Sequence, residues 1–312
     1  MTHSTHTYQD DDRNQSILIN INGDLYERNK AKVSVFDSAF MLGDGVWEGL
    51  RVHQGKMPFL KKHLDRLYAG AKALDFHPGL AKDELAQRLN ETLSANNMQE
   101  GVHIRLMVSR GTKSTPYQDP RVTITPPTIV IIPEYKQTLP ETVTKGIDLF
   151  TVHVRRGFPD VQDPKLNSHS KINCILACIQ ATKAGASEAL MLDPHGFVAT
   201  CNSTHFFIVK DNKVMTSTGQ FCIDGVTRGA VLAICKKNTI SCSQTNFSLS
   251  DVYSADEAFV TGTFAGLVPV TRIDGRVIGE DSELGASDNR GPMVKRLQKL
   301  YAELLESECR DA

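Results

Sequence analysis

Residues 188–216 read EALMLDPHGFVATCNSTHFFIVKDNKVMT, and this stretch decides the fold class. Apolar runs rich in branched and aromatic side chains alternate there with short groups of turn-forming residues. That pattern is typical of short strands joined by turns. The stretch therefore predicts consecutive strands in one sheet.

Helices and further strands are predicted on both sides of this stretch. Residues 171–184 carry apolar side chains on one helical face, namely Ile172, Ile175, Leu176 and Ile179. Residues 227–237 form a helix that opens with the tight sequence DGVTR. Strands are predicted within IDLFTVHVRR (147–156) and AFVTGTFAGLVPVTRIDGRVIG (258–279), and a last amphipathic helix over 293–305.

A smaller domain is predicted before these elements, over residues 15–135. Apolar and polar residues alternate around an Asn22-Gly23 turn, which predicts a hairpin. Residues 58–74 and 82–93 have apolar side chains at helical spacing, and the segments GVHIRLMVSRG and PPTIVIIPEY are typical of strands. Helices and strands occur in both parts, so we expect an α+β protein.

The remaining segments suggest how the chain is divided. Residues 1–14 are polar and are predicted to be a disordered tail. Residues 136–146 are polar, contain a proline and are predicted to link the two domains. Residues 147–312 then form the larger domain.

Composition excludes several partners. The 35 basic and 36 acidic residues give a formal net charge of -1, without the basic face that nucleic acids or membrane surfaces attract. No apolar run approaches the roughly 18 residues of a membrane helix, and the start lacks the apolar core of a signal peptide. Seven scattered cysteines without a CxxC pair predict neither disulfides nor a metal site. We expect a cytoplasmic protein with a small-molecule partner.

Three segments could bind a phosphate group. The amides of Val226 and Thr227 begin a helix behind a glycine, where the helix dipole favours an anion. Thr263 ends the hydroxyl-rich turn TGT, and Arg66 lies on the predicted helix 58–74. Each has an ordinary alternative, as a plain helix start, a plain turn or a solvated charge.

Six motifs follow one another along the chain: GDGVWEG (43–49), HLDRL (63–67), RR..P...DP (155–164), GASEALMLDPHGFV (185–198), GVTR (225–228) and ADEAFVTGT (255–263). Their order and spacing resemble the class IV, or fold-type IV, pyridoxal-phosphate aminotransferases. That family includes branched-chain and D-amino-acid aminotransferases and aminodeoxychorismate lyase. The resemblance extends over nearly all of residues 17–304.

The resemblance implies a fold, a cofactor and a site. The fold would be a small N-terminal α/β domain plus a larger, cofactor-binding domain of sheets wrapped by helices. The cofactor would be pyridoxal 5'-phosphate or pyridoxamine 5'-phosphate, held by Arg66, the Val226 and Thr227 amides, and Thr263. A hydrogen-bonding guanidinium, helix amides and a hydroxyl are suitable partners for a phosphate dianion.

Substrate contacts and assembly follow from the same resemblance. It implies an enzyme acting on amino acids and keto acids, most simply an aminotransferase, and a homodimer. Trp47 would line the substrate pocket. Arg105 would receive a substrate carboxylate or, alternatively, be a strand charge that faces solvent.

The lysine of the family's chemistry is missing from its usual position. A gapless match of DPKLNSHSK to the family pattern puts Asn167 there, and asparagine cannot bond to the cofactor's aldehyde. Lys165, two residues earlier on a predicted strand, would lie about 7 Å away on the same face. Lys171 stands where the family typically has a tyrosine directed at the cofactor. We predict Lys171 as the catalytic amine, with Lys165 as the second candidate.

A second departure affects the cofactor's ring nitrogen. The family places a glutamate against it, and the matching residue here is Thr200. A hydroxyl cannot stabilise a protonated ring nitrogen as a carboxylate does. This difference leaves open a slow aminotransferase, a lyase or racemase, or a catalytically retired homologue that only binds the cofactor.

Overall fold

A computed structural model describes residues 4–279 and 288–310, which form two compact units. The smaller unit contains residues 10–137 and 166–171, and helix α9 adds its last residues to it from 308 onward. The larger unit contains residues 4–9, 138–165 and the described part of 172–307. The sequence predicts the division at 136–146, and the described chain changes unit after Gln137.

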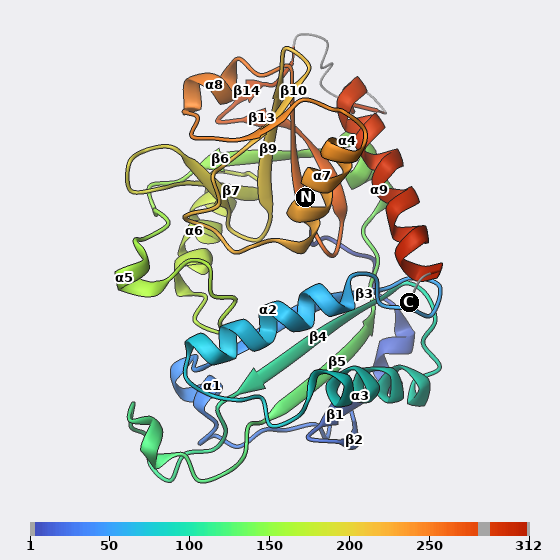
Figure 1. Cartoon of the computed structure of the whole chain (residues 1–312), viewed down its shortest axis with the longest axis vertical. Coiled ribbons are helices and arrows are strands. Elements are labelled where there is room, and N and C mark those ends of the chain that lie inside the picture. Colours follow the sequence, from blue (N-terminus) through green and yellow to red (C-terminus); the bar gives the residue numbers. More distant parts are fainter. Residues whose placement is uncertain (1–3, 280–287, 311–312) are drawn as a thin grey trace. The chain divides into compact units, whose positions relative to one another are not determined.

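The smaller unit contains one antiparallel sheet with the strand order β2-β1-β5-β4-β3 (Figure 1). Asn22 and Gly23 both have positive φ angles in the turn between the first two strands, which confirms the predicted hairpin. The strands are β1 (Leu18–Ile21), β2 (Asp24–Glu27), β3 (Gly45–Val52), β4 (Val102–Ser109) and β5 (Ile129–Tyr135).

Two helices pack on one face of this sheet, and apolar side chains of the helices and the strands together form the core of the smaller unit. Alternate residues of the strands are buried against α2 (Leu60–Ala73) and α3 (Lys82–Ala95), whose leucines Leu64, Leu67, Leu85 and Leu89 belong to the same apolar cluster. Burying such a leucine contributes about 1.5–3 kcal/mol. The unit also contains α1 (Ser38–Leu42) and the short 3-10 helices η1 (Asp12–Ser16) and η2 (Pro120–Val122).

The larger unit contains a mixed sheet with the order β11-β10-β9-β12-β13-β6-β7-β8, and β14 pairs with β13. The strands predicted in residues 188–216 are confirmed as four consecutive elements: β7 (Glu188–Leu192), β8 (Val198–Cys201), β9 (His205–Lys210) and β10 (Lys213–Thr216). The others are β6 (Ile147–Thr151), β11 (Cys242–Gln244), β12 (Glu257–Gly262), β13 (Gly266–Ile273) and β14 (Arg276–Val277). The sheet is parallel where β6 meets β7 and β13, and where β10 meets β11.

The larger unit's helices are α4 (Pro140–Lys145), α5 (Pro159–Gln162), α6 (Ile172–Lys183), α7 (Val226–Lys237), α8 (Leu249–Tyr253) and α9 (Pro292–Arg310). Helix α4 lies within residues that the sequence assigns to a linker. Helix α6 packs on β7 through its buried residues Ala177 and Ala181. Its predicted apolar face is 45–64% exposed in the single chain, at Ile172, Ile175, Leu176 and Ile179.

The N-terminal segment has specific contacts in the larger unit. Thr5 is almost fully buried and donates a hydrogen bond to Glu188, and His6 stacks on Phe264 with ring centroids 5.8 Å apart. Tyr8 forms an isolated β-bridge with Thr138. These contacts hold residues 5, 6 and 8 of the predicted tail against the larger unit. Disorder of residues 1–14 stays a prediction.

Candidate functional site

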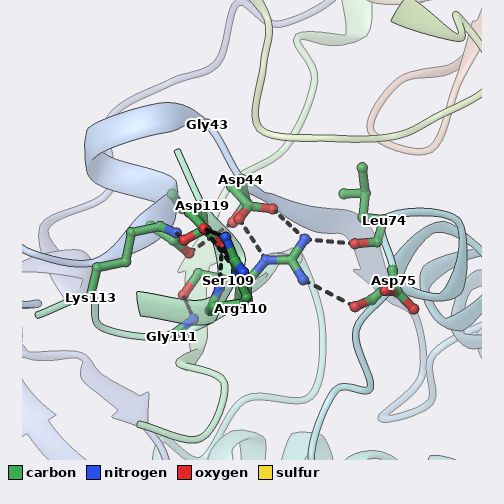
Figure 2. A network of polar contacts seen from close by, with 12 residues as sticks. Gly43, Asp44, Leu74, Asp75, Ser109, Arg110, Gly111, Lys113 and Asp119 are labelled. Carbon is green, nitrogen blue, oxygen red and sulfur yellow. Dashed lines mark hydrogen bonds and ion pairs between the residues drawn. The ribbon is translucent and has the colours of Figure 1, made fainter. Parts of the chain in front are cut away.

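The loop before β3 is fixed to the end of α2 by Arg110. The Arg110 Nε and Nη2 atoms donate to the two Asp44 carboxylate oxygens at 2.7 and 3.1 Å. The same guanidinium donates to the Leu74 carbonyl at 2.6 Å and the Asp75 carbonyl at 3.0 Å (Figure 2). A cation at the carbonyl end of a helix is electrostatically favourable. Arg110 therefore holds the GDG loop and the carboxyl end of α2 in one arrangement.

Two positions of this loop require glycine because other parts of the chain lie too close for a Cβ atom. Gly43 ends α1 with a φ of 69°, and an added Cβ would lie 2.6 Å from the Ser170 hydroxyl. A Cβ on Gly45 would lie 2.6 Å from the Val108 carbonyl oxygen and 2.8 Å from the His169 ring. Residues 168–170 thus lie directly against the start of β3.

Trp47, Asn167 and Lys171 form one hydrogen-bonded cluster in the smaller unit. Asn167 is buried, and its side-chain amide donates to the Trp47 carbonyl at 2.6 Å. The Lys171 ammonium donates to the Asn167 side-chain oxygen at 3.1 Å and lies 5.3 Å from the Trp47 ring centroid. The Trp47 indole donates to the Ser168 carbonyl at 3.1 Å. Lys171 thereby brings an amine to the Asn167 side chain.

Arg105 belongs to the same cluster. Its guanidinium lies 3.7 Å from the Trp47 ring centroid, a cation–π contact. Burial lowers the pKa of Arg105, and the nearby Glu134 charge opposes this effect. The side chain is half-buried and therefore does not have the full solvent exposure of an ordinary strand charge.

Lys165 differs from its predicted position. It lies in a turn rather than on a strand and is exposed, so the expectation that it shares a strand face with residue 167 is wrong. A proline precedes it, and its backbone amide stabilises the turn by donating to the Asp163 carboxylate at 2.9 Å. In addition, Lys165 and Asn167 belong to different units.

Arg66 makes contacts that the sequence did not suggest. Its guanidinium forms two hydrogen bonds with the buried Glu48 carboxylate, at 2.8 and 2.6 Å, and His63 donates to the same carboxylate at 2.7 Å. The alternation of buried Val46, Leu50 and Val52 on β3 could have predicted that Glu48 faces the core.

In the larger unit, no side chain in residues 4–279 or 288–310 caps the start of α7. Its N-cap is Gly225, and the first helical residues are Val226 and Thr227. A Cβ on Gly225 would overlap the His205 ring, whose Nε2 donates to the Ile223 carbonyl at 2.9 Å. A glycine is therefore needed for the helix start to approach β9 this closely, and the first amides keep the anion-binding character of a helix N-terminus.

The TGT turn lies at the end of β12. Thr261 pairs with His205 across the sheet, and its hydroxyl is completely buried without a hydrogen-bond partner in the part of the chain that the structure describes. Thr263 begins the turn to β13 and is partly buried. An unsatisfied buried hydroxyl is unusual, and the first amides of α7 are hydrogen-bond donors in the same unit.

The Thr200 side chain is hydrogen-bonded within the turn that follows β8. Its hydroxyl donates to the Thr204 carbonyl at 2.8 Å, so its only proton is already used. The Thr204 hydroxyl donates to the buried Glu188 carboxylate at 2.8 Å, and Thr5 donates to the other oxygen of Glu188. Sequence reasoning missed Glu188, which has only neutral side-chain donors in these two contacts.

Metal-ligand clusters and membrane-spanning helices are both missing from the described residues. Among residues 4–279 and 288–310, no three His, Cys, Asp or Glu side chains are grouped as metal ligands. No helix in the same residues has the length and apolarity needed to span a bilayer.

Two unlike sheets, one antiparallel and one mixed, and the helices packed on them define an α+β protein. Residues 45–273 match the family described as amino-transferase class IV. The chain belongs to the class IV aminotransferase family, and its structure is that of a fold-type IV aminotransferase, with a small antiparallel sheet and a larger curled mixed sheet.

Relatives support this assignment. The chain is 38% identical to the branched-chain-amino-acid aminotransferase-like protein 2 of Arabidopsis thaliana over 94% of its own length and 51% of that protein. It is 30% identical to the branched-chain-amino-acid aminotransferase of Pseudomonas aeruginosa over 92% of both. A solved branched-chain aminotransferase from Thermoproteus uzoniensis, with norvaline, is 26% identical, with a TM-score of 0.82 over 93% of this chain and 95% of that one. The chain spans about half the length of the Arabidopsis relatives.

A second solved structure is a branched-chain amino acid aminotransferase with pyridoxamine 5'-phosphate. It is 29% identical to this chain, with a TM-score of 0.85, and the match covers 94% of this chain and 95% of that one. The likeness therefore extends over both units of the described chain.

Proposed function

We propose that this chain binds pyridoxal 5'-phosphate or pyridoxamine 5'-phosphate and acts on amino acids and keto acids as an aminotransferase with an altered catalytic centre. The observation that carries the proposal is the start of α7, which no side chain of the described residues caps, in the same unit as the buried Thr261 hydroxyl, which has no hydrogen-bond partner among those residues. A solved relative is described with pyridoxamine 5'-phosphate. Arg66, the amides of Val226 and Thr227, and Thr263 would hold the phosphate group.

Lys171 would provide the amine that the family position 167 lacks. When bound, pyridoxal phosphate supplies an aldehyde and an electron-accepting ring, and the protein must supply an amine that also moves a proton at the substrate's α-carbon. The hydrogen bond from Lys171 to Asn167 supports this role, because the ammonium reaches the side chain at that position. Lys165 is the weaker candidate, since it is exposed in a turn.

Thr200 limits what the centre can do. Because its hydroxyl proton is donated to the Thr204 carbonyl, Thr200 can only accept a hydrogen bond from another group. A neutral acceptor stabilises a protonated ring less than a carboxylate does. Slow transamination is therefore expected, and a lyase or racemase reaction is the alternative for which a weaker electron-accepting ring suffices.

A second candidate function is a binding protein without turnover. It is favoured by the Asn167 side chain, which is buried and hydrogen-bonded through both its oxygen and its nitrogen. The residue that the resemblance places at the family's amine position would then stabilise the fold and do no chemistry. In this case the chain would retain the phosphorylated vitamin and leave it unchanged.

Substrate binding would use Trp47 and Arg105. The stacked guanidinium is held by the indole ring, which reduces the entropy lost when it binds a carboxylate. We therefore assign the carboxylate of the amino acid to Arg105 and its side chain to the neighbourhood of Trp47.

A homodimer is proposed from helix α6. Its exposed residues Ile172, Ile175, Leu176 and Ile179 form an apolar stripe on a helix whose only charged residue is Lys183. A stripe of this kind is self-complementary across a two-fold axis and suits the same helix of a second copy.

The absorbance spectrum of the purified chain, with and without added pyridoxal phosphate, tests the proposal. Uptake should give a visible band, and borohydride reduction followed by peptide mapping should place the pyridoxyl label on Lys171. The variant Lys171→Gln should lose the label, while Lys165→Gln serves as the matched control and should keep it. Failure to take up either form of the vitamin would refute the proposed function. A pyridoxamine-like spectrum that keto acids never change would support the binding protein instead.

A further inference from the structure

Glu48 is a carboxylate in an apolar layer. It lies on the face of β3 that also carries Val46 and Leu50, and this face packs against α2. Its side chain has no exposed surface. Such a carboxylate has a large desolvation cost, which only well-placed donors can offset.

Two residues of α2 provide these donors. His63 and Arg66 are one helical turn apart, so both side chains point to the same strand. His63 donates to one carboxylate oxygen, and the guanidinium contacts both oxygens through Nε and Nη2. Burial would raise the pKa of Glu48, but the hydrogen bonds from His63 and Arg66 and their charges hold it below its usual value. The carboxylate is thus kept ionised.

The three side chains differ in how far they reach the surface. Glu48 and His63 are 0% and 2% exposed, whereas Arg66 retains 16% of its side-chain surface. A fork-shaped contact fixes the plane of the guanidinium as well as its position. Apolar residues in place of such a buried ionic cluster are often as stabilising, so stability alone is a poor explanation for a glutamate between Val46 and Leu50.

We propose that Glu48, supported by His63, is a positioning residue that fixes the Arg66 guanidinium in the orientation that receives the phosphate group of the bound vitamin. The proposal rests on the proposed function, because Arg66 is one of the residues assigned to that phosphate. Glu48 itself does not contact the ligand, since both of its oxygens are directed at α2.

The test compares two ligands that differ only in the phosphate. Pyridoxamine 5'-phosphate and pyridoxamine are titrated against the full chain, with the fluorescence of Trp47, the single tryptophan, as the signal. Glu48→Gln should weaken binding of the phosphorylated ligand about tenfold or more, as expected for losing an oriented charged hydrogen bond, and should change pyridoxamine binding less than about twofold. Asp65→Asn, on the exposed side of the same helix, is the control and should change neither affinity.

Two further variants separate positioning from general damage. In an Arg66→Met background, Glu48→Gln should cause no further loss of phosphate-dependent affinity, because its effect is transmitted through Arg66. Glu48→Asp keeps the charge but shortens the side chain, and should show an intermediate loss if Glu48→Gln does not fold. Equal weakening of both ligands, or no change in either, would overturn the positioning role. A wild-type chain that binds neither ligand would instead overturn the proposed function.

Discussion

The Arg110 contacts lead to a quantitative prediction about the smaller unit. Arg110 donates two hydrogen bonds to Asp44 and two to carbonyls at the end of α2, and the two side chains are only 14% and 20% exposed. Fully exposed pairs contribute about 0–1 kcal/mol, while buried charged hydrogen bonds contribute about 1.5–3 kcal/mol each. After a discount for partial exposure, Arg110→Met should lower the free energy of unfolding by about 2–4 kcal/mol.

A double-mutant cycle isolates the pair. Arg110→Met, Asp44→Asn and the double variant are unfolded in urea, and Trp47 reports on the smaller unit because it is the single tryptophan. The coupling energy should be about 1–2 kcal/mol, since the double variant leaves no buried charge unpaired. Asp65→Asn breaks the exposed pairs of Asp65 with Lys61 and Lys82 and should cause no measurable change. Additive losses, or a loss below about 0.5 kcal/mol for Arg110→Met, would refute the reasoning.

Three further predictions concern separate parts of the chain. Burial lowers the pKa of His169 to about 4 from 6.5, so the unfolded state binds more protons than the folded state between these two pH values. The free energy of unfolding should therefore fall by up to about 3 kcal/mol as the pH drops from 6.5 to about 4. Urea unfolding of the variant His169→Gln should not show this fall. Replacing Ile175 and Ile179 by glutamate should convert a dimer to monomers in analytical ultracentrifugation, whereas an unchanged dimer would place the interface elsewhere. Gly225→Ala should lower stability by about 1–3 kcal/mol by displacing His205, measured by thermal unfolding, and a shift within error would contradict the close contact.

Local signals predicted much of the fold. The Asn22-Gly23 turn and the strands of residues 188–216 depend on the conformational preferences of a few adjacent residues, which can be recognised directly in the sequence. The predicted helix over 227–237 was also found, and α7 begins one residue earlier, at Val226. In contrast, the spacing of Ile172 and Ile175 predicted a helical face correctly but could not say what covers it, because periodicity describes one element and not its neighbours.

The site was harder to predict because it depends on contacts between distant residues. Lys171 was chosen for its place in a motif, and its hydrogen bond to Asn167 requires an irregular backbone over 167–171 that the spacing alone does not define. Arg66 was interpreted as a phosphate ligand or a solvated charge, and Glu48 was overlooked because a lone charge in a strand is ordinarily exposed. Lys165 was placed on a strand, whereas the proline before it belongs to a turn.

The contact between Gly225 and the His205 ring has a consequence for sequence evolution. A Cβ atom at position 225 would occupy the space that the His205 ring fills. A homologue with a side chain at 225 must therefore have a smaller residue at 205 to keep the start of α7 in place. Substitutions at these two sites, about twenty positions apart in the chain, should therefore be inherited as a correlated pair among the sequences of this lineage.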